Sequence, residues 1–236
     1  MRLDKFISEM GLASRKEASL LAKRGQILVD GAPERDASRH IDPERQSISF
    51  MGREVLYRKY TYVMLNKPEG YVSATEDSRL PVVTELLPAQ LRKQELFPVG
   101  RLDKDTVGLM ILTNNGQLAH TLLSPRRHVE KEYIFECAEP LPIGAKDAFR
   151  DGITLGDGYE CKPSELRCSE GRMGGRIVLT EDKYHQIKRM IASFNNRVTR
   201  LERVRFADVP LDGSLPRGEW RYLTDGEIRL LEERAK

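Results

Sequence analysis

The residues best suited to chemistry lie in the segment 100–114, which reads Gly-Arg-Leu-Asp-Lys-Asp-Thr-Val-Gly-Leu-Met-Ile-Leu-Thr-Asn. It places Arg101, Asp103 and Asp105 in a polar turn just before the apolar run 109–112, which is typical of a buried strand. A carboxylate fixed at the start of a buried strand has few rotamers and little water around it. Such a group suits nucleophilic or acid–base catalysis, in which position and ionisation must both be controlled.

Asp103 also has simpler interpretations. Most aspartates before strands cap a backbone amide in a turn, and position alone favours that role. A calcium loop is excluded, because Val107 occupies its fifth position and Asn114 its twelfth, where a bidentate glutamate is required. A catalytic role for Asp103 therefore depends on which other side chains the fold brings to it.

A second segment, 181–190, brings cationic and planar polar side chains to the start of a helix predicted over 184–194. Its apolar residues recur with helical spacing, so one face is buried and Lys188 lies near the edge of that face. A cation beside Asp103 would lower the pKa of the carboxyl group and keep it ionised. Taken alone, Lys188 is more typical of a surface charge and His185 of a structural residue.

A third candidate is Tyr133, in the run Lys131-Glu132-Tyr133. A tyrosine in a predicted strand is usually a core residue. Its ring can also stack on a nucleobase, and its hydroxyl group can exchange a proton with a ligand.

The bulk composition is that of a soluble globular protein, with 32% charged and 39% apolar residues in a chain of 236. This length accommodates one large domain, or a small and a medium one. No run of 18 apolar residues predicts a membrane span, and the N-terminal residues resemble a charged helix rather than a signal peptide. We therefore expect a cytoplasmic protein. Its three cysteines (Cys137, Cys161 and Cys168) fit no zinc spacing and are expected to be free packing residues.

The N-terminal quarter predicts two short helices followed by strands. Leu3, Phe6 and Ile7 recur with helical spacing, and Ser14 with Glu17 forms a capping box for the second helix. The polar faces of the two helices carry six cations: Arg2, Lys5, Arg15, Lys16, Lys23 and Arg24. Their concentration indicates contacts with phosphate groups, although any one of them alone would be read as a solvated charge.

The distribution of charge agrees with this interpretation. Residues 1–59 hold 12 Lys and Arg against 9 Asp and Glu, whereas the rest of the chain holds 27 of each. A positive module joined to a neutral body is typical of a protein that grips a polyanion through one part.

After a polar linker at 51–59, strands outnumber helices and do not alternate with them. This pattern predicts an α+β fold, in which a mixed, largely antiparallel sheet is flanked by helices. The predicted domains are an N-terminal αβ module, 1–58, and a second domain, 59–236. Strands are predicted at 62–65, 97–99, 109–112, 133–137, 177–180 and 198–206. Helices are predicted through 118–122 with Asn114 or Asn115 as the cap, at 184–194 and after a capping box at 224–227. No exposed apolar stripe requires a partner, so a monomer is expected.

Four ordered motifs together resemble a known family, the RNA pseudouridine synthases. They are Leu65-Asn66-Lys67-Pro68-x-Gly70, the run from Gly100 to Leu109, Lys131-x-Tyr133 and His185-Gln186-Ile187-Lys188-Arg189-Met190. Residues 1–50 resemble the S4 RNA-binding module, through Arg-Leu-Asp-Lys-Phe and Ser-Arg-Lys-Glu-Ala. The His185-Gln186 pair resembles the residues found at this place in the branch of the family that modifies small-subunit ribosomal RNA. The sequence has Asp182-Lys183 where the family usually has Gly-Arg. We expect this difference to affect the local backbone shape and not the reaction.

The resemblance implies a role for each matching residue. Asp103 would be the catalytic carboxylate, Lys188 its ion-pair partner, and Tyr133 a ring that stacks on the target base and exchanges a proton. Leu201 would form the apolar wall of the pocket. Arg101 would support the flipped nucleotide or fill the place that it leaves.

The implied reaction is an isomerisation of uridine in 16S ribosomal RNA, by resemblance at the 516-type site, within an assembling small subunit. The uracil leaves the ribose at N1, turns over and rejoins through C5, so no metal or cofactor is expected. Whether Asp103 attacks C1′ or removes the 2′ proton stays open. Two alternatives are a non-catalytic RNA-binding or ribosome assembly protein, and a synthase that acts on large-subunit ribosomal RNA.

Overall fold

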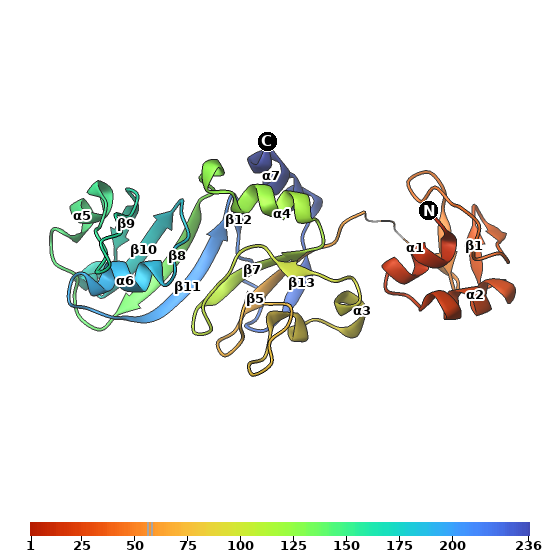
Figure 1. Cartoon of the computed structure of the whole chain (residues 1–236), viewed down its shortest axis with the longest axis horizontal. Helices are drawn as coiled ribbons and strands as arrows, with labels where there is room; N and C mark the ends of the chain where they lie inside the picture. Colours follow the sequence, from red (N-terminus) through yellow and green to blue (C-terminus); the bar gives the residue numbers. More distant parts are fainter. Residues whose placement is uncertain (56, 58) are drawn as a thin grey trace. The chain divides into compact units, whose positions relative to one another are not determined.

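The computed structural model describes residues 1–55, 57 and 59–236 (Figure 1). The chain forms two compact units. The first comprises Met1–Thr61 and Leu87–Leu96, and the second comprises Tyr62–Leu86 and Phe97–Lys236. The boundary predicted after residue 58, and part of the linker predicted at 51–59, involve Leu56 and Arg58, which lie outside the described residues.

The first unit packs helices on a small sheet. Ser14 caps the second helix as predicted: its hydroxyl accepts from the Glu17 amide, and the Glu17 carboxylate accepts from the Ser14 amide. Leu3, Phe6 and Ile7 are fully buried in the core of this unit. The helices are α1 (Leu3–Glu9), α2 (Arg15–Lys23) and α3 (Ala89–Arg92), and the sheet has the order β2-β1-β3-β4, with β1 at Ile27–Val29, β2 at Ala32–Pro33, β3 at Ile48–Phe50 and β4 at Arg53–Glu54.

The second unit is built on a sheet whose main path runs β13-β5-β7-β11-β8-β10-β9, with β6 on β7 and β12 on β11. The β7–β11 pair is parallel and the other described pairs are antiparallel. The predicted mixed, largely antiparallel α+β fold is confirmed. The strands are β5 (Tyr62–Lys67), β6 (Phe97–Pro98), β7 (Val107–Thr113), β8 (Lys131–Cys137), β9 (Glu165–Cys168), β10 (Gly174–Leu179), β11 (Val198–Phe206), β12 (Val209–Pro210) and β13 (Trp220–Tyr222).

Helices flank this sheet at both of its ends (Figure 1). The helix α4 packs against α7, whereas α5 contacts β9 and α6 contacts β11. The α-helices are α4 (Gly116–Leu123), α5 (Ala145–Asp151), α6 (Gln186–Ala192) and α7 (Asp225–Ala235), with short 3-10 turns η1 (Val83–Leu86), η2 (Pro125–Arg127) and η3 (Glu170–Arg172). No helix in the described part of the chain is long and apolar enough to cross a membrane.

The centre of the sheet depends on a close approach between β7 and β11. All seven residues of β7 are buried, as the apolar run predicts. Gly108 pairs with Arg203 in the parallel ladder at φ +100°, and a Cβ atom there would lie 2.3 Å from the Arg203 carbonyl oxygen. Only glycine accommodates both the left-handed backbone and this distance. The turn that carries Asp103 is thereby set beside the end of β5 and the middle of β11.

Two predicted helices differ in how well their boundaries agree with the structure. The helix predicted at 118–122 is α4, and the Asn115 side chain caps it by accepting from the Leu118 amide. The helix predicted over 184–194 begins only at Gln186, because His185 adopts a left-handed conformation with φ 50°. The sequence pattern does not signal this turn, and the correction matters because His185 and its neighbours line the site.

Candidate active site

A small cavity of about 50 Å³ lies where the turn before β7 meets the β10–α6 connection. Its floor and walls come from separate parts of the second unit. The lining residues are Arg101, Leu102, Asp103 and Thr106 from the turn, Tyr133, Leu179 and Leu201 from strands, and Glu181, Asp182, Lys183, His185, Gln186 and Ile187 from the connection and the helix start.

An ion pair between Asp103 and Lys188 joins the two sides of this cavity. The Lys188 Nζ lies 2.8 Å from the Asp103 Oδ2 and 2.6 Å from the Asp105 Oδ1. The side chains of Asp103 and Lys188 are only 28% and 23% exposed, whereas Asp105 is 69% exposed. Partial burial acts to lower the pKa of Lys188, but the hydrogen bonds and charges of the two aspartates outweigh it and raise that pKa. Lys188 therefore keeps its positive charge beside Asp103.

A buried ammonium group, that of Lys67, binds the backbone of the turn that carries Asp103. Lys67, the last residue of β5, is 0% exposed, and it pairs with Gly108 at the start of β7. Its Nζ donates to the carbonyl oxygens of Pro68, Asp103, Lys104 and Thr106 at 3.1, 3.0, 3.3 and 2.7 Å. These contacts fix the backbone of the turn, which leaves Asp103 little freedom apart from its side-chain rotamer.

Burial of Lys67 has an electrostatic consequence. It lowers the pKa of Lys67 from 10.5 to about 8, although the charges of Asp105 and Asp103 act in the opposite direction. The residue drew attention in the sequence only as part of a motif. Nothing in the sequence pattern predicts four backbone acceptors, since three of them come from the turn that follows β6.

Tyr133 forms part of the cavity wall from β8. Its side chain is 6% exposed and stands opposite Arg203 of β11 in the antiparallel ladder. Burial raises the pKa of Tyr133 to about 12, so the phenol is protonated throughout the physiological range. A neutral phenol with a buried ring can both stack on a base and donate a hydrogen bond.

Arg203 is a buried cation that the sequence analysis missed. It is 0% exposed, and its Nε donates to the Leu109 carbonyl oxygen at 2.8 Å. Its Nη1 has no hydrogen-bond partner among the described residues. A basic residue within an alternating strand pattern is normally placed on the solvent face, so periodicity alone gives no signal for this arrangement.

The connection between β10 and α6 is shaped by a buried carboxylate. Glu181 accepts from the Tyr159 hydroxyl at 2.8 Å, from the Lys162 amide at 2.9 Å and from the Gln186 side chain at 2.6 Å. The Gln186 Oε1 in turn accepts from the Lys183 amide at 3.0 Å. This network closes the turn that precedes α6.

The same turn brings His185 close to Asp103, the candidate catalytic carboxylate. The His185 Nε2 lies 3.6 Å from the Asp103 Oδ1, and its ring stacks on Tyr184 with a centroid separation of 3.9 Å. The interpretation of His185 as a purely structural residue did not anticipate this proximity, which depends on its left-handed backbone.

The structure brings five of the predicted site residues together. Asp103, Tyr133, Arg101 and Leu201 line one cavity, and Lys188 bonds to Asp103. Leu201 is 7% exposed, which suits an apolar wall, whereas Arg101 is exposed at the rim.

The six cations predicted to contact RNA fall into two groups in the first unit. On α1 and just before it, Arg2 pairs with Asp4 at 2.7 Å and Lys5 with Glu9 at 3.5 Å. On α2 and at its end, four cations are exposed and have no ion-pair partner among the described residues: Arg15, Lys16, Lys23 and Arg24.

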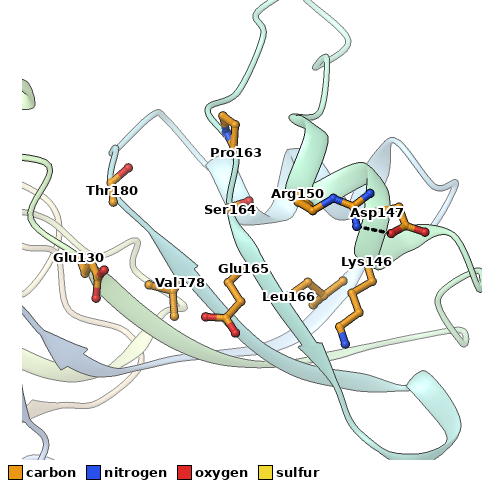
Figure 2. Close-up of a pocket in the computed structure, with 10 residues that line it drawn as sticks. All are labelled: Glu130, Lys146, Asp147, Arg150, Pro163, Ser164, Glu165, Leu166, Val178 and Thr180. Atoms are coloured by element: carbon orange, nitrogen blue, oxygen red, sulfur yellow. Dashed lines mark ion pairs between the residues drawn. The ribbon is translucent and has the colours of Figure 1, made fainter.

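A larger groove of about 650 Å³ lies elsewhere in the second unit (Figure 2). Val178 lines it, whereas the next residue, Leu179, lines the Asp103 cavity, so the two face opposite sides of β10. Its charged residues are of both signs, and Arg150 is paired with Asp147 at 2.8 Å. The groove therefore lacks an excess of positive or negative side chains that would favour a ligand of the opposite charge.

Neither the cysteines nor the acids form a metal site within the described residues. No group of three or more His, Cys, Asp and Glu side chains is suitably placed there. Cys137 and Cys161 are buried and Cys168 is half-buried, and each has a free thiol.

Comparison with known families gives two matches along the chain. The family described as RNA pseudouridylate synthase matches residues 61–207, and the S4 domain matches residues 1–46. The first match contains the whole Asp103 cavity.

Similar proteins cover nearly the full length. An uncharacterised RNA pseudouridine synthase, YtzG of Bacillus subtilis strain 168, is 42% identical over 99% of both chains. Proteins named ribosomal small subunit pseudouridine synthase A are 38% identical in Yersinia pestis, over 97% of both chains, and 36% identical in Escherichia coli K12, over 97% of this chain and 98% of that protein. A crystal structure of a pseudouridylate synthase aligns with a TM-score of 0.69 at 35% identity, over 98% of this chain and 99% of the other.

The buried position of Lys67 predicts a pH dependence of stability. Its pKa is about 8 in the folded protein and 10.5 when solvated, so between these values the unfolded chain binds more protons. The free energy of unfolding contributed by Lys67 must therefore rise with pH in this window. From about pH 7.5 to about pH 9.5, wild type should gain about 2 kcal/mol relative to Lys67→Met in urea unfolding.

The matched control is Lys104→Met, because Lys104 is exposed in the same turn. Its difference from wild type should not vary over this pH range. A difference between wild type and Lys67→Met that stays constant with pH would contradict the buried, depressed ammonium group.

Proposed function

The chain belongs to the RNA pseudouridylate synthase family and carries an S4 domain, and on this basis we propose that it isomerises one uridine of 16S ribosomal RNA. As a member of this family it is an RNA-modifying isomerase. The names of the Yersinia and Escherichia relatives support the small subunit as target, and we propose the 516-type site by resemblance. The observation that carries the catalytic assignment is the ion pair that Lys188 forms with Asp103, a residue of the cavity wall.

We assign the chemistry to Asp103. The reaction breaks the N1–C1′ bond of uridine, turns the uracil over and forms a C5–C1′ bond, after which C5 loses a proton and N1 gains one. Asp103 acts either as a nucleophile at C1′ or as a base at the 2′ position. Both routes need the carboxylate at a fixed place, and the Lys188 ammonium group holds it there through a contact of 2.8 Å.

Three further residues have proposed roles in holding the nucleotide. Tyr133 stacks on the target base and, as a neutral phenol, exchanges a proton with it. Leu201 forms the apolar wall that keeps water from the detached uracil. Arg101, exposed at the rim, supports the extruded nucleotide or occupies the place that it leaves.

We propose that the cations of the first unit supply binding energy through RNA phosphates. Extruding a base costs a few kcal/mol, and phosphate contacts help to offset this cost. Arg15, Lys16, Lys23 and Arg24 should contribute more than Arg2 and Lys5, which must exchange their carboxylate partners for phosphate.

We further propose that the chain acts as a monomer in the cytoplasm on an assembling small subunit. The large apolar residues that are exposed in the described part of the chain are scattered over several elements, including Leu20 on α2, Met51 and Ile143. They form no stripe that a second copy would need to cover.

The phosphate contacts predict a salt dependence of RNA affinity. Replacing Arg15, Lys16, Lys23 and Arg24 by Gln should weaken binding and reduce the slope of log affinity against log salt by about 3, because each phosphate contact contributes roughly 0.7–0.9. The affinity is measured by fluorescence anisotropy over a salt series. The matched control, Arg2→Gln with Lys5→Gln, should change the slope less. An unchanged slope in the fourfold variant would show that α2 does not contact phosphates.

The target and the catalytic assignment are tested together by mapping pseudouridines in both ribosomal RNAs of cells that lack this protein. We expect one pseudouridine to disappear from 16S RNA and to return with the wild-type gene. Asp103→Asn should restore none while retaining RNA affinity, because an amide can neither attack C1′ nor remove a proton. Asp105→Asn is the matched control: Asp105 also bonds to Lys188 but does not line the cavity, so this variant should restore the modification.

Each other outcome has a distinct meaning. Restoration by Asp103→Asn would refute its catalytic role. A pseudouridine lost from large-subunit RNA would move the target there. Defective small subunits with an unchanged pseudouridine map would favour an assembly factor instead.

A further inference from the structure

Tyr184 is an exposed aromatic residue beside the cavity that the proposed chemistry does not use. Its side chain is 73% exposed, and its neighbours Lys183 and His185 line the cavity. An isolated exposed tyrosine is common and needs no explanation. Tyr184 differs because its ring is ordered against another ring that itself contacts Asp103.

The geometry presents one face of Tyr184 to solvent in a defined orientation. Its ring lies nearly parallel to that of His185, with an interplanar angle of 17° and a centroid separation of 3.9 Å. Since His185 covers one face and most of the side chain is exposed, the other face is open. His185 is in turn fixed by its left-handed backbone and by its 3.6 Å approach to Asp103.

The backbone on both sides of the stack is fixed as well. Gln186 bonds to the Lys183 amide and to Glu181, which anchors the turn that carries Tyr184. The Arg189 side chain donates to the Tyr184 carbonyl oxygen at 3.4 Å. An open ring face held in this way can accept a planar ligand with little further loss of conformational entropy.

The charges around the stack indicate the chemistry of that ligand. Arg101 and Lys183 lie at the cavity rim, and Lys104 is exposed in the adjoining turn. Of the acids beside them, Asp105 is bonded to Lys188, and Asp182 lies 3.9 Å from Lys131. An open aromatic face combined with cations is the arrangement that binds unpaired nucleotides, because each base offers a π face and each phosphate a negative charge. The His185 ring lies between Tyr184 and Asp103, so a base on the open face of Tyr184 is separated from Asp103 by these two stacked rings. We expect a nucleotide that neighbours the target in the RNA chain to bridge this separation.

We propose that Tyr184, backed by His185, is a binding subsite for the unpaired base that flanks the target uridine in the RNA chain. The subsite rests on the proposed function, because it needs a uridine extruded at Asp103. When the target uracil enters the cavity, the flanking base loses the uracil as its stacking partner. It can then stack on the Tyr184 ring instead. The subsite therefore favours RNA in which the target lies in an unpaired segment over RNA in which it lies within a duplex.

The test uses the full chain and a 16S RNA fragment that contains the modified uridine, with 2-aminopurine at each flanking position in turn. Stacking quenches the fluorescence of this base analogue. Tyr184→Ala should raise KM roughly tenfold, remove the quench at one flanking position and leave kcat within about twofold, because the contact contributes to binding rather than to the chemical step. Tyr184→Phe, which keeps the ring, should behave like wild type.

Two controls distinguish a failure of the stacking subsite from a loss of folding and from a failure of the proposed function. Tyr222→Ala removes another exposed tyrosine that does not line the cavity, and it should change neither KM nor the quench. Melting temperatures of the two Tyr184 variants should match wild type, because this side chain is mostly exposed. If wild type forms pseudouridine while Tyr184→Ala keeps a normal KM and quench, the stacking subsite is wrong. If cells that lack the protein keep every pseudouridine of their ribosomal RNA, the proposed function fails, whereas a quench that depends on Tyr184 would still support base stacking there.

Discussion

The site depends on one ion pair, between the Asp103 carboxylate and the Lys188 ammonium group, whose atoms lie 2.8 Å apart. The two residues are 85 positions apart in the chain and come from different elements. Their meeting requires the parallel β7–β11 pair at the centre of the sheet, which fixes the start of β7 just after the Asp103 turn, and the contact of α6 with β11, which brings Lys188 to the same place. Because both partners are mostly buried, each one restricts the orientation of the other, and the pair is less screened than a surface salt bridge.

A second constraint is the burial of three basic side chains in the sheet beside the cavity. Lys67 and Arg203 are fully buried and Lys131 is 5% exposed. Burial lowers the pKa of both lysines, which is the expected cost of removing ammonium groups from water. Backbone carbonyls compensate Lys67, whereas Lys131 lies 3.9 Å from the Asp182 carboxylate. This arrangement gives up stability in order to hold a turn and a carboxylate in place, which is typical of functional sites.

Sequence reasoning predicted which residues meet at the cavity better than it predicted the contacts that hold them there. The motif around Asp103, the buried strand after it and the capping box at Ser14 follow from local pattern and chemistry, because each involves residues close in sequence. The α+β class with a mixed sheet followed from the irregular alternation of strands and helices. Arg203 was missed, and the burial of Lys67 was not foreseen, since a basic residue next to apolar ones is read as exposed. Their partners are backbone atoms of distant turns and strands, which no local pattern specifies.

The start of α6 illustrates the same limit. Helical periodicity extends back to residue 184, yet the helix begins at Gln186 because the Glu181–Gln186 network imposes a left-handed conformation on His185. Likewise, α5 and β9 lie in a part of the chain, 138–173, for which no element was predicted. The pairing of Arg2 with Asp4 also reduces the number of free cations in the N-terminal module below the six that composition indicates.

The central claim is that Lys188 sustains the reactive state of Asp103 and does not merely stabilise the fold. The most direct test is the single-turnover rate of pseudouridine formation at saturating RNA in Lys188→Met and Lys188→Arg. We predict a loss of roughly a hundredfold or more in Lys188→Met, with RNA affinity unchanged, because the carboxylate loses both its charge partner and its orientation. Lys188→Arg should retain most of the rate. A wild-type rate in Lys188→Met would contradict the account.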